Sequence, residues 1–204
     1  MGWGKQELLS ATGGKILRDG KQMAFGEIVT DSSKAQAGSV FIALKGERHD
    51  GHRFIGDAVR RGATCVILQR MPKKIAAGEA AILKVRDTLR ALGDLAHYRR
   101  AQIAPKVLAI TGSNGKTTTK EMLAAILEEA SLNGKRLRGR VLKTEGNFNN
   151  LVGLPLTLLR LREDDKVAVV ELGTNHPREI QRLAEIADPC GGIITSIAGA
   201  HLEG

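Results

Sequence analysis

A short glycine-containing segment, Thr111–Thr118, carries the residue types that bind phosphate groups. It reads T-G-S-N-G-K-T-T. Gly112 and Gly115 permit sharp backbone turns, which bring amide groups close to phosphate oxygens. Lys116 supplies a positive charge, and Thr117 supplies a hydroxyl that can bind a magnesium ion. An apolar run precedes the segment and an apolar helical pattern follows it, and this strand–loop–helix order is the context that a phosphate-binding loop requires.

The segment therefore predicts a site for a nucleoside triphosphate. The residues expected around the phosphates are Thr111, Gly112, Ser113, Asn114, Gly115, Lys116, Thr117 and Thr118. The spacing differs from the commonest form, G-x-x-x-x-G-K-[ST], because Ile110 stands where that form has its first glycine. The alternative is a chance Gly-Lys-Thr in a strand-to-helix turn, and the two flanking elements argue against it.

Two further apolar runs end beside side chains that could complete a metal site. The run 167–172 contains Glu171, and the run 192–197 leads to His201. Because the carboxyl ends of parallel strands meet at one edge of a sheet, Glu171 and His201 could converge with Thr117 around a metal ion held against the phosphates. Taken singly, Glu171 could instead pair with a lysine, and His201 could be an ordinary solvated histidine.

Apolar periodicity over the whole chain predicts strands that alternate with helices, so the fold class is α/β with a largely parallel sheet. The expected strands are 39–44, 65–68, 80–85, 107–110, 167–172 and 192–197, and the expected helices are 7–11, 54–62, 87–103, 116–127, 154–161 and 179–187. A break near Ile103-Ala104-Pro105 predicts a domain boundary, which gives domains 1–104 and 105–204.

Composition is that of a folded globular chain. The 204 residues are 42% hydrophobic and 26% charged. No apolar run approaches the roughly 20 residues of a membrane span, and the N-terminus lacks the apolar core of a signal peptide. We therefore expect a cytoplasmic protein with no membrane span. Cys65 and Cys190 lie far apart in apolar surroundings, which predicts two buried thiols and neither a disulfide nor a metal site.

The net charge of +9 is uneven: residues 1–104 hold 18 Lys/Arg against 10 Asp/Glu. Such an excess suits nucleic acid or a small polyanion. Only six residues are Phe, Trp or Tyr, so no stacking platform for nucleic acid is present. The densest basic run, 135–140, is interpreted as a solvated loop. A small diphosphate-bearing molecule is therefore the favoured partner, and no nucleic acid is expected.

Taken together, these segments resemble the Mur ligases, a family of ATP-dependent amide-forming enzymes of peptidoglycan synthesis. Besides the phosphate loop, T-E-G-N-F-N-N-L-V-G-L-P (Thr144–Pro155), E-L-G-T-N-H (Glu171–His176) and A-H-L-E-G (Ala200–Gly204) are similar to the branch that adds D-Ala-D-Ala. T-D-S (Thr30–Ser32) and F-I-A-L-K-G-E-R-H-D-G-H (Phe41–His52) are similar to the UDP-substrate domain of that family. The resemblance covers nearly the whole chain in the same order.

The resemblance implies a small N-terminal α/β substrate domain, followed by the first half of a mainly parallel-sheet P-loop ATPase domain, in a monomer. It implies ATP, Mg²⁺, UDP-N-acetylmuramoyl-tripeptide and D-Ala-D-Ala as ligands, with the tripeptide carboxylate activated as an acyl phosphate. The implied residue roles are catalysis by Lys116, Asn147, Glu171 and His201, magnesium binding by Thr117, Glu171 and His201, and substrate binding by Ser32, Lys45, His52, Asn149 and Asn150.

The chain departs from the family pattern at several points. Ser33 stands where the family usually has arginine, Arg178 stands where it usually has glycine, and segment 131–140 is longer than is typical. Family members continue through more of the ATPase sheet and a third domain, so we expect that this 204-residue chain exposes a sheet edge and does not complete the ligation alone.

Three other interpretations remain open at this point. The first is another member of the superfamily, such as the diamino-acid-adding ligase or a folylpolyglutamate synthase. The second is a non-catalytic nucleotide-binding module, which would bind ATP without acceptor-dependent phosphate release. The third, a nucleic-acid binder, would show steeply salt-dependent binding to oligonucleotides.

Overall fold

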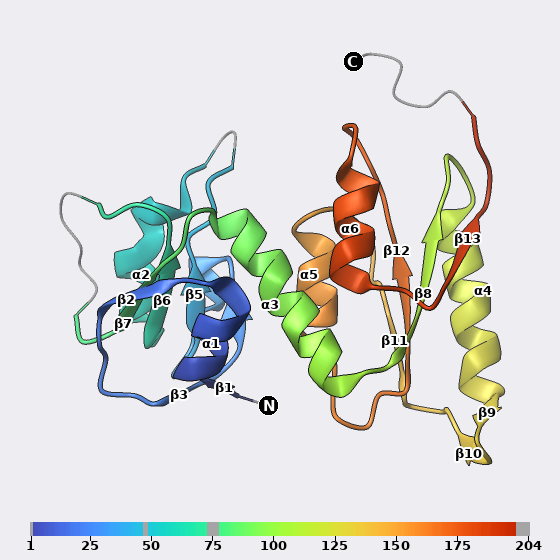
Figure 1. Ribbon diagram of the computed structural model, residues 1–204, viewed down its shortest axis with the longest axis horizontal. Helices are drawn as coiled ribbons and strands as arrows, with labels where there is room; N and C mark the ends of the chain where they lie inside the picture. Colours follow the sequence, from blue (N-terminus) through green and yellow to red (C-terminus); the bar gives the residue numbers. More distant parts are fainter. Residues whose placement is uncertain (1, 47–48, 73–77, 199–204) are drawn as a thin grey trace. The chain divides into compact units, whose positions relative to one another are not determined.

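The computed structural model describes residues 2–46, 49–72 and 78–198 (Figure 1). The chain forms two compact units, Met1–Leu95 and Ala96–Gly204. The division falls inside helix α3 (Thr88–Ile103), which contributes residues to both units. The expected α/β class is confirmed. The domain boundary placed after residue 104 from the sequence stays a prediction.

Unit 1 is built on a five-stranded sheet with the order β2-β7-β6-β5-β4. Strands β4 to β7 pair in parallel, and β2 pairs antiparallel with β7. The sheet strands are β2 (Lys15–Arg18), β4 (Ile28–Val29), β5 (Val40–Ile42), β6 (Cys65–Leu68) and β7 (Ala81–Lys84). The remaining elements are β1 (Trp3–Gly4), which pairs with β3 (Ala24–Phe25), helices α1 (Lys5–Thr12) and α2 (Ile55–Arg60), and the 3₁₀ helices η1 (Ser32–Lys34) and η2 (Gly51–Phe54).

Strands β5 and β6 are buried on both faces, which is why they appear in the sequence as short continuous apolar runs. On one face, Phe41 and Val66 pack with Ile55 and Ala58 of α2. Strands β1 to β4 were not predicted from the sequence, because these short strands each include exposed or half-buried residues and form no extended apolar run.

Unit 2 holds a four-stranded parallel sheet with the order β11-β12-β8-β13. Its strands are β8 (Lys106–Thr111), β11 (Val141–Lys143), β12 (Val167–Glu171) and β13 (Gly191–Ile194), and its helices are α4 (Lys116–Glu129), α5 (Gly153–Leu158) and α6 (Glu179–Ala187). Segment 131–140 is a basic hairpin formed by β9 (Ser131–Leu132) and β10 (Lys135–Arg136), with exposed strand residues.

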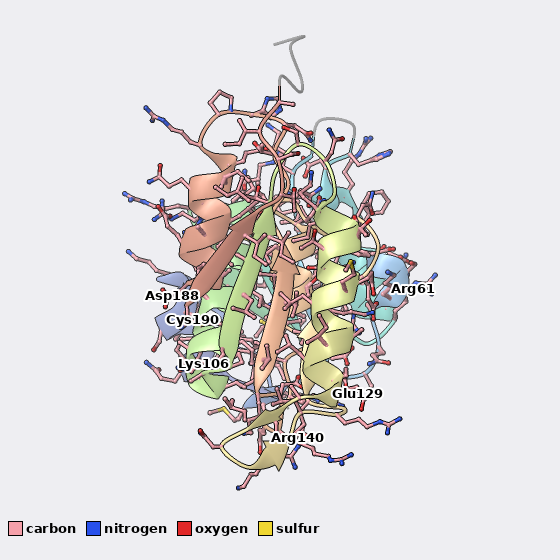
Figure 2. All side chains as sticks on the ribbon, turned by 90° about the vertical axis from the view of Figure 1, so that its right-hand side faces the viewer. Arg61, Lys106, Glu129, Arg140, Asp188 and Cys190 are labelled. Carbon is pink, nitrogen blue, oxygen red and sulfur yellow. The ribbon has the colours of Figure 1, made fainter. Side chains whose placement is uncertain are left out.

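The two faces of this sheet are covered by different helices. Val167 and Val169 pack on the α4 side with Ala124, whereas Ala168 and Val170 pack with Leu183 of α6. The alternation follows from the two-residue period of a strand. Figure 1 shows α4 on one side of the sheet and α5 and α6 on the other, and Figure 2 views the unit from the α4 side.

The connections place one loop at a topological switch. From β8 the chain crosses through α4 to the β11 side, and from β12 it crosses through α6 to β13 on the other side of β8. Ligands of open parallel sheets bind where such connections diverge, at the carboxyl ends of the strands. In Figure 2, Lys106 marks the start of β8, so the loop after β8 lies at the opposite end of the sheet.

The surface of unit 2 differs from expectation at one thiol. Cys190 is exposed, although Cys65 is buried as expected. Cys190 lies just before edge strand β13, where Ile193 and Ile194 are also exposed. Within the part of the chain that the structure describes, no helix combines the length and apolar character needed to cross a bilayer.

Candidate functional site

The loop between β8 and α4 has the backbone of an anion site. Gly112 has φ +132° and Gly115 has φ +81°, and Gly115 is the N-cap of α4. These angles lie in the region that favours glycine. The first amides of a helix have no acceptor within the helix, so those at the start of α4 point out from the loop and carry the positive end of the helix dipole. Lys116 Nζ donates to the carbonyl of Gly112 at 2.6 Å, which holds the ammonium group over the loop.

The segment after β13 braces this loop from one side. The Ser113 amide donates to the carbonyl of Ser196 at 3.0 Å, and the Asn114 amide donates to Ser196 Oγ at 3.0 Å. Ser113 Oγ donates to the carbonyl of Ala198 at 3.0 Å. A Cβ at Gly112 would lie 2.3 Å from Thr195 Oγ1. The amides of Ser113 and Asn114 thus already donate to Ser196. The amides at Gly115 and at the start of α4 are therefore the ones expected to bind an anion.

Glu171 lies at the end of central strand β12 and is only 2% exposed. Its carboxylate oxygens accept from two side chains, Thr117 Oγ1 at 3.0 Å and Asn149 Nδ2 at 2.8 Å. Thr117, the residue after the loop lysine, and Glu171 therefore lie within hydrogen-bonding distance, as expected from the sequence. Hydroxyl and carboxylate oxygens are the ligands that Mg²⁺ prefers, so this pair fits such an ion. Asn149 thus orients the carboxylate, and the substrate contact that the family resemblance implies for it stays a prediction.

The other polar residues of segment 145–150 have different positions. Asn150 Oδ1 accepts from the amides of Val152 and Gly153, which start helix α5, so its side chain is used as a cap. Asn147 is exposed, and its carbonyl accepts the Asn149 amide at 2.8 Å. Asn147 thus remains available to a ligand, whereas Asn150 serves the backbone.

A cavity of about 410 Å³ lies beside the loop. Its lining residues are Thr111, Gly112, Ser113, Lys116, Leu172, Thr174, Ile180, Ile194, Ser196, Ile197 and Ala198. The loop contributes polar groups to this lining, whereas α6 and β13 contribute the apolar Ile180 and Ile194, and this combination suits a ligand with a charged end and a flat apolar part. The sequence identified the loop but not the contribution of residues 194–198; the hydroxyls of Thr195 and Ser196 at a strand end were the available signal.

The third expected metal ligand, His201, lies outside the described residues. Among the described residues, no group of three His, Cys, Asp or Glu side chains is arranged to hold a metal ion. His176, in the E-L-G-T-N-H segment, contacts Glu179 through its backbone amide. Glu179 Oε2 accepts the amides of Asn175 at 2.7 Å and His176 at 3.1 Å. Burial raises the pKa of Glu179, but these amide hydrogen bonds outweigh it and the pKa is lowered.

Unit 1 has a second cavity of about 410 Å³. It is lined by Thr30, Asp31, Ser32, Phe41, Leu44, Gly46, His49, Gly51 and Phe54. Ser32 is one of these lining residues, and Lys45 stands in the chain between two others, Leu44 and Gly46. Asp31 Oδ1 accepts from the amide and hydroxyl of Ser33, at 2.9 and 2.8 Å, which fixes the turn that presents Ser32.

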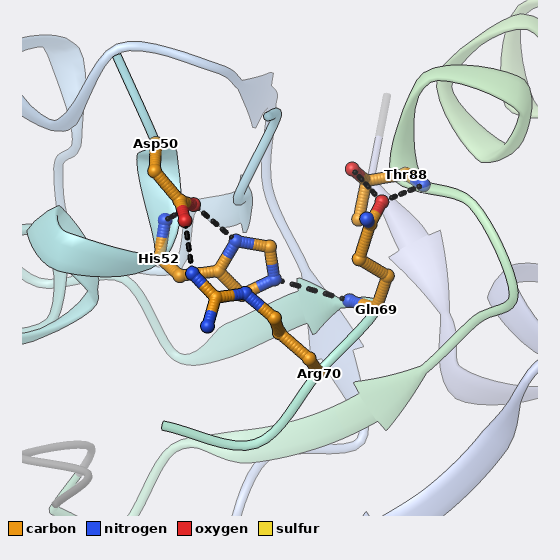
Figure 3. A network of polar contacts seen from close by, with 5 residues as sticks. All are labelled: Asp50, His52, Gln69, Arg70 and Thr88. Carbon is orange, nitrogen blue, oxygen red and sulfur yellow. Dashed lines mark hydrogen bonds and ion pairs between the residues drawn. The ribbon is translucent and has the colours of Figure 1, made fainter. Parts of the chain in front are cut away.

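His52, the third substrate-binding candidate of this unit, is not one of these lining residues, and its side chain is only 3% exposed. Its Nδ1 lies 2.7 Å from Asp50 Oδ1, and its Nε2 accepts the Gln69 amide at 3.3 Å (Figure 3). Gln69 Oε1 accepts in turn from Thr88, and Asp50 Oδ2 pairs with Arg70. Both ring nitrogens are engaged, so the structure favours a positioning role for His52 over direct substrate contact.

Comparison with known proteins gives matches over most of the chain. The Mur ligase middle domain matches residues 110–204, and the domain described as Mur ligase family, catalytic domain matches residues 25–100. The UDP-N-acetylmuramoyl-tripeptide--D-alanyl-D-alanine ligase of Haemophilus influenzae is 45% identical over 178 residues, which are 87% of this chain and 37% of the relative.

Solved structures give the same result. MurF from Acinetobacter baumannii superimposes with a TM-score of 0.89 at 43% identity, over 99% of this chain and 42% of that one. MurF ligase from Thermotoga maritima, solved in complex with ADP, has a TM-score of 0.69 at 36% identity, over 80% of this chain and 35% of that one. The chain thus spans about two fifths of the length of these relatives.

Proposed function

This chain belongs to the Mur ligase family, and we propose that it supplies the acceptor-binding unit and the nucleotide-binding loop of an ATP-dependent ligase of peptidoglycan synthesis. The proposed reaction joins D-Ala-D-Ala to UDP-N-acetylmuramoyl-tripeptide in the cytoplasm. The observation that carries the proposal is the cluster of Lys116, Thr117, Glu171 and Asn149 beside the cavity at the carboxyl ends of β8 and β12.

A carboxylate is a poor acyl donor, so amide formation requires its activation. In the proposed reaction, the tripeptide carboxylate attacks the γ-phosphate of ATP, which forms an acyl phosphate and releases ADP. The D-Ala-D-Ala amine then attacks the acyl carbon, which forms the amide bond and releases phosphate. Positioning and charge neutralisation are the main contributions of a protein to phosphoryl transfer. Mg²⁺ would supply charge neutralisation at the phosphates when it is bound.

The residues of this chain have distinct parts in the proposal. Lys116 leaves the Gly112 carbonyl and binds phosphate oxygens together with the first amides of α4. Thr117 and Glu171 hold the metal ion, with His201 as a third candidate. Asn147, which is exposed, is proposed to contact the γ-phosphate or the acceptor carboxylate.

The unit 1 cavity is proposed to hold the uridine diphosphate end of the acceptor. Ser32 lies in its wall, and Lys45 adds positive charge nearby. The excess of Lys and Arg in residues 1–104 favours binding of a diphosphate. His52 supports this site indirectly, through Asp50 and the strand that carries Gln69.

Binding, and not turnover, is the decisive measurement, because the chain spans about two fifths of its relatives. Titration with a fluorescent ATP analogue should show Mg²⁺-dependent binding, and Lys116→Met should weaken it at least about tenfold, since charged hydrogen bonds contribute roughly 1.5–3 kcal/mol. Lys106→Met, at the opposite end of β8, is the matched control and should bind normally. Equal affinities of the two variants would refute the nucleotide site.

Calorimetry tests the acceptor site separately. UDP-N-acetylmuramoyl-tripeptide should bind more tightly than the dipeptide form or UDP alone. Equal binding of all three ligands would contradict the choice of acceptor but leave a uridine site. No binding of any of them by a folded chain would contradict the proposed role of unit 1.

A further inference from the structure

Lys120 is a buried charged residue that the proposed function leaves without a role. It lies on α4, one turn after Lys116, and is 1% exposed. Burying an ammonium group costs free energy unless it is paired and hydrogen-bonded, and an apolar side chain of similar volume often stabilises such a site better. A lysine at this position therefore points to a contact that an apolar residue could not make.

That contact is with the backbone of the neighbouring strand end. Lys120 Nζ donates to the carbonyl oxygen of Thr144 at 2.7 Å, and it lies 3.0 Å from Glu121 Oε1. Glu121 also pairs with Lys143, and the hydrogen bonds from Lys143 and then Lys120 lower the pKa of Glu121. The ammonium group is thus balanced by a carboxylate at the surface while it holds a buried carbonyl.

Thr144 passes this contact on to Glu171. Thr144 is fully buried and follows β11 directly. Its amide donates to the carbonyl of Val169 at 3.0 Å, and its Oγ1 accepts the Glu171 amide at 3.0 Å. The carbonyl, amide and hydroxyl of one residue therefore connect α4, the strand pair β11–β12 and the backbone of Glu171. The Glu171 carboxylate, held by Thr117 and Asn149, completes a closed ring of contacts back to α4.

We propose that Lys120 is a positioning residue for the nucleotide site, which acts through Thr144 to fix the backbone of Glu171 opposite Thr117. The proposal rests on the proposed function for its effect on ligands, but not for its geometry. Without the ammonium group, the buried Thr144 carbonyl has lost its donor and must shift to find another. That shift moves the hydroxyl that holds Glu171, and the carboxylate then no longer faces Thr117 at hydrogen-bonding distance.

The test compares substitutions that break the chain of contacts at two points with controls that leave it intact. Lys120→Met removes the ammonium group at similar length, and Thr144→Val removes the acceptor of the Glu171 amide. Lys143→Met is the matched control, because the Lys143 ammonium group pairs with the same Glu121, whereas the Thr144 carbonyl accepts from Lys120. Thr144→Ser retains the hydroxyl and should rescue the effect of Thr144→Val.

Two readouts separate positioning from general stability. In the nucleotide-free chain, amide exchange followed by NMR should show the Glu171 amide exchanging about tenfold faster in Lys120→Met and Thr144→Val. ATP affinity should be measured with Mg²⁺ and with EDTA. In both variants the affinity with Mg²⁺ should fall about tenfold, whereas the affinity with EDTA should change less than about twofold. The double variant should lose no more than the larger single loss, because both changes break one path.

The outcomes are distinguishable. Normal Glu171 exchange and a normal Mg²⁺ increment in folded Lys120→Met would overturn the proposal, as would equal losses in Lys143→Met. If the unsubstituted chain binds no ATP, the proposed function fails, and amide exchange alone decides the role of Lys120. If Lys120→Met does not fold, the contrast between Thr144→Val and Thr144→Ser decides whether the path through Thr144 exists.

Discussion

Arg178 occupies a backbone position that suits glycine, and this predicts a stabilising substitution. It is the N-cap of α6 and has φ +70° and ψ −2°. In this left-handed region a Cβ approaches the backbone carbonyl, and the cost is about 1–2 kcal/mol. The Arg178 side chain is exposed, so its removal should sacrifice little packing. Arg178→Gly should therefore stabilise unit 2, and the family resemblance had pointed to glycine at this position.

The expected gain is smaller than the strain itself. Glycine also gives the unfolded chain more conformational entropy, which lowers the free energy of unfolding by roughly 0.4–1 kcal/mol and offsets part of the strain energy that the substitution removes. The net gain is about 0.5–1 kcal/mol, or about 2–4 °C in the melting temperature of a unit of this size. Circular dichroism melting measures it. Arg178→Ala is the matched control, because it removes the same charge and keeps the strained Cβ.

The result that refutes this reasoning is equally specific. If Arg178→Ala stabilises the chain as much as Arg178→Gly does, the charge and not the backbone conformation is responsible. If Arg178→Gly lowers the melting temperature, the exposed arginine side chain makes a contribution larger than the strain. In either case, backbone strain at Arg178 would not be what limits the stability of the start of α6.

Two further predictions concern the phosphate loop and the Asp50–His52 network. Gly112→Ala should abolish ATP-analogue binding, because its Cβ would lie 2.3 Å from Thr195 Oγ1 at φ +132°. Gly139→Ala is the control, because Gly139 also has a positive φ but open space around it, and this variant should bind normally. Retained binding by Gly112→Ala would contradict the view that close packing against Thr195 shapes the loop. Burial raises the pKa of Asp50, but hydrogen bonds from Arg70 and His52 lower it to about 2 from 3.8. A lowered carboxyl pKa stabilises the fold above the unfolded value, so this contribution should be lost as pH falls from about 4 to about 2. In thermal melting at decreasing pH, Asp50→Asn should lose less stability than the unsubstituted chain does. The same pH dependence in both would contradict this role of Asp50.

Much of the site could be predicted from the sequence, because its signals are local. Gly112, Gly115 and Lys116 lie within five residues, and the apolar runs on either side specify the strand and helix that make the loop an anion site. The two-residue and 3.6-residue periods also placed the longer elements, and α6 was predicted with the observed bounds. The pairing of Thr117 with Glu171 followed from the rule that parallel strands end at one edge.

The tertiary structure alone decided which side chains complete each contact. Residues 195–198 brace the loop from more than 80 positions away in the chain, and Asn149 reaches Glu171 from the segment that follows the neighbouring strand β11. His52 shows the reverse case: its motif suggested a ligand contact, but burial against Asp50 and Gln69 uses both ring nitrogens.

Lys120 illustrates the general reason for this division. In the sequence it is one more polar residue in T-T-T-K, and helical spacing gives no sign that its ammonium group reaches Thr144. Backbone propensity and periodicity act over a few residues, so the sequence by itself determined the loop, the α/β class and the principal elements. Side-chain hydrogen bonds depend on register and distance between strands that are remote in sequence, and these are set only when the sheet has formed.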